Sequence, residues 1–145
     1  MRQIPNLSKS KFITGVQCLK YLYLTCYSPE LAEEVDEAAE AIFEQGKEVG
    51  RWAQQYFPGG VLVEEDYRNH QAAVKRTQEL MADKNVPAIF EAAFSFDNIW
   101  LRVDVLERHT KNRWRMIEVK STSGVKDVHL PDVAIQKYVL KNCGV

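Results

Sequence analysis

Two acidic residues in the second half of the chain lie in strongly apolar surroundings. Asp104 stands between two valines, and Glu118 lies inside the segment 116–120. A charge within an apolar strand is costly unless it is paired or bound to a metal ion. Two carboxylates and a backbone carbonyl, here that of Val119, are the hard oxygen ligands that Mg²⁺ or Mn²⁺ prefers. We therefore expect a metal site formed by these two segments.

Lys120 adds a cation to this set and points to phosphodiester hydrolysis. A bound Mg²⁺ or Mn²⁺ polarises a phosphate oxygen and lowers the pKa of a coordinated water. Lys120 could hold or help to deprotonate that water and offset charge in the transition state. A second interpretation stays open, because an Asp and a Glu-x-Lys also occur on any half-exposed hairpin whose charges face water.

The elements that must position these residues are strands. After Pro87 the pattern has a period of two and predicts strands over residues 88–96, 99–108 and 114–121, with a tight turn at Asp97-Asn98. Because successive side chains alternate between faces, Asp104 and Glu118 lie side by side if the last two strands pair, with Lys120 one pleat away. The face of Asp104 would also carry Trp100, Arg102 and Leu106, and that of Glu118 would carry Met116.

The first half of the chain is mostly helical. The pattern predicts a helix capped by Ser8 that runs through Tyr23, and another from Pro29 to the Pro58-Gly59-Gly60 stop. A short strand over 61–64, a helix over 68–83 and a last helix from Pro131 or Asp132 to before Gly144 complete the order. Gly46 and Gly50 lie on one helix face and are expected to permit close approach of another backbone. The order predicts an α/β fold (mixed α+β), with helices flanking a central mixed sheet.

Composition limits the class of protein. The 145 residues fit one domain, with 46% hydrophobic and 27% charged residues and a net charge of −1. We find no transmembrane stretch and no signal peptide, and the odd count of three cysteines favours a cytoplasmic setting. Between Arg102 and Lys126, seven basic residues outnumber three acids. This stretch is either a phosphate-binding surface or a solvated edge of the sheet.

Motifs around the acidic residues resemble a known nuclease family. Arg-Val-Asp104-Val-Leu, followed by Ile-Glu118-Val-Lys120-Ser and a helix with Gln136, resembles the RecB-like branch of the PD-(D/E)XK superfamily. That branch includes nuclease domains of bacterial recombination helicases, which act in DNA repair, and CRISPR-associated RecB-like exonucleases. Residues 7–23 are similar to the opening segment of uncharacterised bacterial proteins of this superfamily. The resemblance implies a restriction-endonuclease-like core, Mg²⁺ or Mn²⁺ as cofactor, and DNA as substrate.

The resemblance also implies roles for single residues. Asp104 and Glu118 would be metal ligands and Lys120 the catalytic lysine. Glu91 would bind a second metal ion or orient water, and Gln136 would contact substrate or brace the site. Further phosphate contacts are expected from basic residues on the same stretch, namely Arg102, Arg115 and Lys126.

Three departures from the family pattern bear on activity. Gly50 stands where many members carry a metal-binding His. Cys18 matches the first cysteine of an iron–sulfur cluster, but only Cys143 follows late in the chain, so no cluster is expected in this polypeptide. The chain ends at Val145, soon after the Gln136 helix, which predicts an N-terminal piece of a longer protein or a sheet edge completed by a partner such as a second copy.

Three functions remain at this point. The favoured one is metal-dependent hydrolysis of DNA. The main alternative is a catalytically degenerate module of the same fold that binds nucleic acid or acts as a scaffold in a larger enzyme. The third is a small α+β interaction domain without a role in nucleic-acid chemistry.

Overall fold

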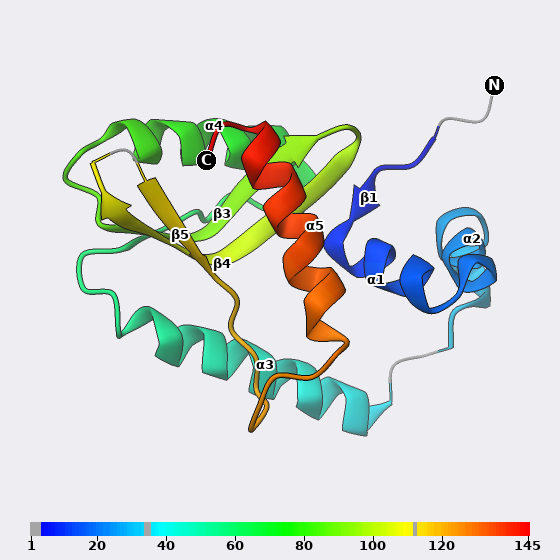
Figure 1. The fold of residues 1–145 in the computed structure, drawn as a ribbon. Helices are drawn as coiled ribbons and strands as arrows, with labels where there is room; N and C mark the ends of the chain where they lie inside the picture. The colour runs from blue at the N-terminus through cyan, green and yellow to red at the C-terminus, as the bar shows by residue number, and fades with distance from the viewer. Residues whose placement is uncertain (1–3, 34–35, 112) are drawn as a thin grey trace.

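The computed structural model describes residues 4–33, 36–111 and 113–145 as a curled mixed sheet flanked by helices (Figure 1). This agrees with the predicted mixed α/β class. The strands are β1 (Leu7–Ser8), β2 (Val61–Leu62), β3 (Ala88–Phe96), β4 (Ile99–Thr110) and β5 (Arg113–Ile117). The α-helices are α1 (Lys9–Gln17), α2 (Leu19–Tyr27), α3 (Glu37–Gln54), α4 (His70–Ala82) and α5 (His129–Asn142), and two 3-10 turns cover Pro29–Leu31 and Tyr67–Asn69.

Strand β4 is the centre of the sheet. On one side it pairs antiparallel with β3. On the other side it pairs first with β1, in parallel, at Ile99 and Trp100, and then with β5, antiparallel, from Val105 onward. Among the described residues, the stretch of β4 between Trp100 and Val105 therefore has no strand partner on that side, and Asp104 lies in this gap.

The hairpin between β3 and β4 agrees with its prediction in detail. β3 spans the predicted residues, and Phe96 pairs with Ile99 across a two-residue turn. Both turn residues have positive φ, 50° at Asp97 and 60° at Asn98. Asp and Asn tolerate this conformation, and a two-residue turn of this kind matches the twist of the flanking strands.

The core lies between the sheet and helices α4 and α5. Figure 1 shows α4 and α3 on opposite sides of the sheet, with α5 crossing in front of it. On β4 the predicted alternation holds from Ile99 to Val105, because Ile99, Leu101, Val103 and Val105 are buried while Trp100, Arg102 and Asp104 are half-buried. It fails at Leu106, which was predicted on the Asp104 face and is fully buried. A smaller apolar cluster of Phe90, Ala88 and Val105 packs against Phe57, Ile117 and Val119.

The first predicted helix is two helices. Ser8 does cap α1, since its side chain accepts a hydrogen bond from the Lys11 amide at 3.3 Å. Cys18, however, is extended (φ −161°, ψ 115°) and separates α1 from α2. Gly15 allows the two helices to pack closely, because a Cβ atom there would lie 2.8 Å from a Leu22 methyl group.

The second predicted helix begins later than expected. Pro29 opens only a 3-10 turn, and α3 begins after Asp36, whose side chain accepts from the Ala39 amide at 2.7 Å. Val35, inside the predicted helix, lies outside the described residues. The expectation that Gly46 and Gly50 permit close backbone approach is wrong, because a Cβ atom at either position would meet nothing within 4 Å. No described residue of α3 is buried.

The ends of other helices and strands differ from their predicted positions by a few residues. β2 ends at Leu62, and α4 follows a 3-10 turn. The last helix begins at His129, which puts Pro131 in its first turn, where proline is tolerated. β5 ends at Ile117 rather than at residue 121, because the Val119 amide bonds a side chain instead of continuing the ladder. The two-residue β1 was not predicted.

No helix among the described residues combines the length and the apolar character needed to cross a membrane.

Candidate active site

Asp104 and the 118–120 segment meet as the strand pattern predicts. Val105 pairs with Ile117, so Asp104 and Glu118 are the next residues in register. The Val119 amide donates a hydrogen bond to Asp104 Oδ2 at 2.7 Å. This bond ties the segment after β5 to the unpaired stretch of β4. It positions both carboxylates in the gap that β1 and β5 leave open.

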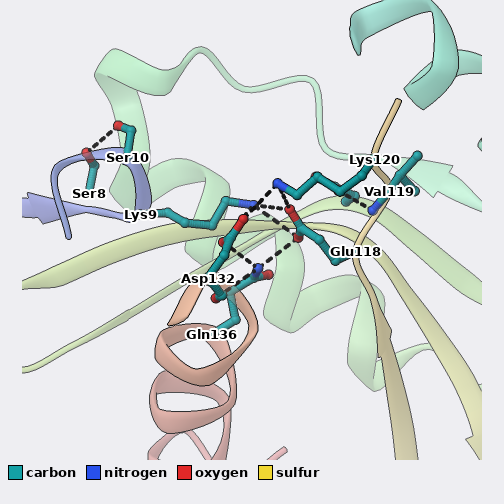
Figure 2. Close-up of polar contacts among 9 residues, drawn as sticks. Ser8, Lys9, Ser10, Glu118, Val119, Lys120, Asp132 and Gln136 are labelled. Atoms are coloured by element: carbon teal, nitrogen blue, oxygen red, sulfur yellow. Dashed lines mark hydrogen bonds and ion pairs between the residues drawn. The ribbon is translucent and has the colours of Figure 1, made fainter. Parts of the chain in front are cut away.

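Two lysines from opposite ends of the chain converge on Glu118. Lys9, in the first turn of α1, lies 3.0 and 3.1 Å from the two carboxylate oxygens, and Lys120 lies 2.7 Å from Oε1. The Glu118 side chain is only 7% exposed. Figure 2 shows the two ammonium groups arriving from opposite directions. Glu118 is therefore the centre of a charged network and not a solvated surface residue.

Helix α5 supplies the second half of this network. Asp132 accepts from Lys120 at 2.7 Å, and its other oxygen lies 3.8 Å from the Lys9 ammonium (Figure 2). Gln136, one turn later on the same helix face and fully buried, donates to Glu118 Oε2 at 2.8 Å and to Asp132 Oδ1 at 3.1 Å. Gln136 thus braces the two carboxylates, which is one of the two roles expected of it.

These contacts set the charge states of Glu118 and Lys120. Burial opposes ionisation of Glu118, but the nearby Lys9 charge and hydrogen bonds from Lys120 and Gln136 lower its pKa to about 2. Burial also disfavours the charged form of Lys120. Hydrogen bonds to Asp132 and Glu118 outweigh burial and raise its pKa above the ordinary value. Lys120 is therefore an ammonium ion at neutral pH.

The pKa values of Asp104 and Glu91 are raised, whereas that of Glu118 is lowered. Burial raises the pKa of Asp104, although the Lys9 charge acts against it. Burial and the nearby Asp104 carboxylate raise the pKa of Glu91. Glu91 occupies the β3 position opposite Asp104 but has a φ of 55°, which interrupts the pairing there. No lysine or arginine among the described residues forms an ion pair with either carboxylate.

The balance of charge fits a divalent cation. Four carboxylates (Glu91, Asp104, Glu118 and Asp132) face two ammonium groups (Lys9 and Lys120) and the guanidinium of Arg102, whose charge acts on Glu91. An excess of one negative charge is left when all are ionised. The two carboxylates without a lysine are those whose pKa is raised. Gln136 Oε1 is also buried without a hydrogen-bond partner among the described residues. Hard oxygen donors in a partly buried site of this charge suit Mg²⁺ or Mn²⁺.

The side chains are not, however, gathered into a closed cage. Within the described part of the chain, no three His, Cys, Asp or Glu side chains approach closely enough to hold an ion by themselves. Asp104, Glu118 and the carbonyl of Val119 would have to share an ion with water or substrate oxygens. Mg²⁺ commonly keeps several waters and substrate phosphates in its shell.

In the described part of the chain, the other predicted residues form no hydrogen bond or ion pair with this network, although the charge of Arg102 acts on Glu91. Arg102 donates to backbone carbonyls, and Arg115 on β5 pairs with Glu107. Lys126 lies in the exposed loop before α5 and Gly50 on exposed α3. Cys18, Cys26 and Cys143 are free thiols.

Lys9 and Asp132 were not predicted as site residues. Asp132 had one available signal, since it precedes Gln136 by one helical turn and therefore shares its face. Lys9 had another: Ser8 caps the helix, which puts Lys9 at its first position, where the helix dipole disfavours a cation. A lysine there needs an anion from elsewhere in the fold, and the sequence alone does not say which one.

Comparison of the chain with protein-family models, with curated proteins and with solved structures found no match in any of the three.

Proposed function

We propose that this chain is a metal-dependent deoxyribonuclease of the PD-(D/E)XK type, in its RecB-like branch. One observation carries the proposal: Asp104 Oδ2 bonds the Val119 amide, while Lys120 is held on Glu118. Two carboxylates, a strand-end backbone and a fixed ammonium ion thus share one gap of the sheet. The mixed sheet with flanking helices supports a restriction-endonuclease-like core as part of the same proposal.

In this proposal Asp104 and Glu118, with the carbonyl of Val119, hold Mg²⁺ or Mn²⁺. When bound, the ion polarises the phosphate and acidifies a water molecule. Asp132 and Glu118 fix the Lys120 ammonium between them at 2.7 Å each. Because its pKa is raised, Lys120 orients water or a phosphate oxygen and offsets negative charge in the transition state, and it does not act as a base. Glu91, which ionises less readily, can accept a proton from water.

Two measurements test the proposal. Mn²⁺ binding is measured by calorimetry on wild type and Asp104→Asn, and we expect binding to weaken at least tenfold in the variant. Cleavage of single- and double-stranded DNA with Mn²⁺ is then compared between wild type and Lys120→Ala, where we expect a loss of about 100-fold. Lys137→Ala is the matched control, because Lys137 is an exposed lysine on α5 next to Gln136.

The outcomes separate the candidate functions. The absence of Mn²⁺ binding by wild type would refute the nuclease. Equal cleavage by wild type and Lys120→Ala would refute the role of the lysine. DNA binding without cleavage would favour the degenerate, binding-only module, for which the specific support is the lack of three clustered metal-type side chains in the described residues.

A further inference from the structure

A pocket lies next to the network and shares Lys9 with it. It has a volume of about 480 Å³ and lies between the first turn of α1, the beginning of α4 and the first half of β4. Its lining includes Lys9, Lys11 and Arg102 together with Tyr67, His70 and Trp100, and contains no acidic residue. In a protein of net charge −1, this pocket is a local concentration of positive charge. It therefore favours an anionic ligand.

Lys11 and Arg102 keep their charge available. Lys11 Nζ lies 3.4 Å from the Asn6 carbonyl, and Arg102 donates to the carbonyls of Val63 and Glu65. Neither forms an ion pair with a carboxylate in the described part of the chain. Backbone carbonyls thus hold both side chains in place without cancelling their charge. Ser8 and Ser10 also line the pocket. Figure 2 shows these two side chains at the start of α1, apart from Glu118.

The other wall of the pocket is aromatic. Trp100 stacks on His70 with ring centroids 4.7 Å apart and planes 7° apart. His70 is buried, and its Nε2 lies 3.0 Å from the Phe94 carbonyl. Burial lowers the pKa of His70, so the ring is neutral at pH 7. Tyr67 is 71% exposed at the pocket. An aromatic surface beside unpaired cations suits a nucleic-acid base and its phosphate.

The pocket is aligned with the active site. Trp100, Arg102 and Asp104 are alternate residues on one face of β4, so Arg102 lies about 7 Å and Trp100 about 13 Å from Asp104 along the strand. One or two nucleotides of an extended strand span this distance. Lys9 lines the pocket, and its ammonium group reaches Glu118. A DNA strand lying along this face of β4 would contact the pocket and the active site at once.

We propose that this pocket binds one unstacked nucleotide of single-stranded DNA beside the scissile phosphate, with its phosphate near Lys11 and Arg102 and its base on Tyr67 and Trp100. The proposal rests on the nuclease function proposed above for its link to cleavage. A base in a duplex is stacked on its neighbours and cannot present its face to an aromatic side chain without leaving the stack. The pocket therefore predicts that the protein prefers single-stranded DNA or frayed duplex ends to an intact duplex.

Binding of a fluorescein-labelled oligothymidylate, measured by anisotropy in EDTA to prevent cleavage, tests the pocket. We expect Tyr67→Ala to weaken binding about tenfold and Tyr67→Phe to retain it, because stacking needs only the ring. Lys11→Ala should weaken binding and reduce its salt dependence. Tyr56→Ala and Lys20→Ala are matched controls, since both residues are exposed and lie outside this pocket. In a Trp52→Phe, Trp114→Phe variant, oligonucleotide should quench the emission of Trp100.

Several results would overturn the pocket. Equal affinities of Tyr67→Ala and Tyr56→Ala would do so, as would a blunt duplex that binds as tightly as the single strand. Thymidine monophosphate that binds as tightly as the oligonucleotide would refute the assignment to a strand. Failure of the nuclease proposal is distinguishable: Tyr67-dependent binding without Mn²⁺-dependent cleavage supports the pocket and refutes the nuclease. If cleavage requires Asp104 but DNA binding does not change in the Tyr67 and Lys11 variants, the nuclease is supported and the pocket is refuted.

Discussion

Glu91 combines two features that oppose folding. Its φ of 55° is unusual for a residue with a side chain, and its carboxylate is partly buried next to Asp104. Left-handed backbone costs an L-residue about 1–2 kcal/mol. Strain of this kind persists where the surroundings impose it, and it often marks functional sites.

Replacing Glu91 by glycine should therefore raise the free energy of unfolding by about 1 kcal/mol, measured by urea denaturation. If the carboxylate contributes to metal binding, the same variant binds Mn²⁺ more weakly. Ser95→Gly is the control, because Ser95 lies on the same strand with ordinary φ and should lose about 0.5–1 kcal/mol. A variant at Glu91 that is destabilised as much as the control would contradict the strain argument.

His70 makes stability depend on pH. Burial lowers its pKa from the ordinary 6.5, so the unfolded chain binds a proton that the folded chain does not. The stabilisation that neutral His70 gives to the folded state is complete above the pKa of the unfolded chain. It is lost as the pH falls below 6.5 toward the lower pKa of His70 in the folded state. Urea midpoints at about pH 7.5 and about pH 5.5 should differ less in His70→Gln than in wild type. His109→Gln, at an exposed position, should keep the wild-type difference.

Helix α4 completes an edge of the sheet that β2 leaves open. β2 pairs only with Ile89 and Phe90, so the later part of β3 has no strand on that side within the described ranges of the chain. There the Thr77 hydroxyl accepts from the Ala93 amide at 2.9 Å and donates to the Ala73 carbonyl. Thr77 is fully buried. One side chain thus satisfies a strand amide that would otherwise be buried without a partner.

The substitution Thr77→Val keeps the shape of this side chain but removes the acceptor. We expect the free energy of unfolding to fall by about 1–3 kcal/mol, because the Ala93 amide remains buried and unpaired. Thr25→Val tests the hydroxyl alone, since the Thr25 hydroxyl only bonds the Tyr21 carbonyl within α2. That control should change stability by less than about 0.5 kcal/mol. Similar losses in the two variants would show that the edge contact does not matter.

Helix α3 is the element least explained by packing. Its apolar residues include Ile42, Phe43 and Trp52, which are all exposed. The sequence pattern correctly predicts a helix here, because a stripe of apolar residues is a local property. The Asp36 cap was not predicted. The apolar pattern does not predict which surface of the molecule the helix packs against.

Ion pairs connect a residue near the N-terminus with residues in the last third of the chain. Lys9, near the N-terminus, reaches Glu118 and Asp132, and α1 packs against both β4 and α5. The site exists only when these distant segments meet. Partly buried hydrogen bonds to charged groups are stronger than neutral ones.

Lys9→Met should lower the free energy of unfolding by about 2 kcal/mol in EDTA. Removal of the ammonium leaves Glu118 with one cation fewer. Lys20→Met, on the exposed face of α2, should have almost no effect. If Mn²⁺ binds at this site, saturating Mn²⁺ should restore part of the loss in Lys9→Met, because a ligand of the folded state stabilises it. Equal urea midpoints for the two lysine variants would contradict this role of Lys9.

The sequence was sufficient for features that depend on near neighbours. The β3–β4 hairpin, its Asp97-Asn98 turn and the proximity of Asp104 to Glu118 follow from alternation and from turn residues that tolerate positive φ. These patterns arise from backbone geometry over a few residues. The nuclease chemistry stays a prediction that rests on them.

Other features required the tertiary structure. The roles of Lys9 and Asp132, the gap between β1 and β5, and the pocket at Trp100 depend on distant segments, such as Lys9 and Glu118, which are 109 residues apart. The absence of a partner for Gly46 and Gly50 is of the same kind. Local propensity gives no information on which distant segments meet, because that choice is made by the burial of the apolar faces together with the pairing of their charges.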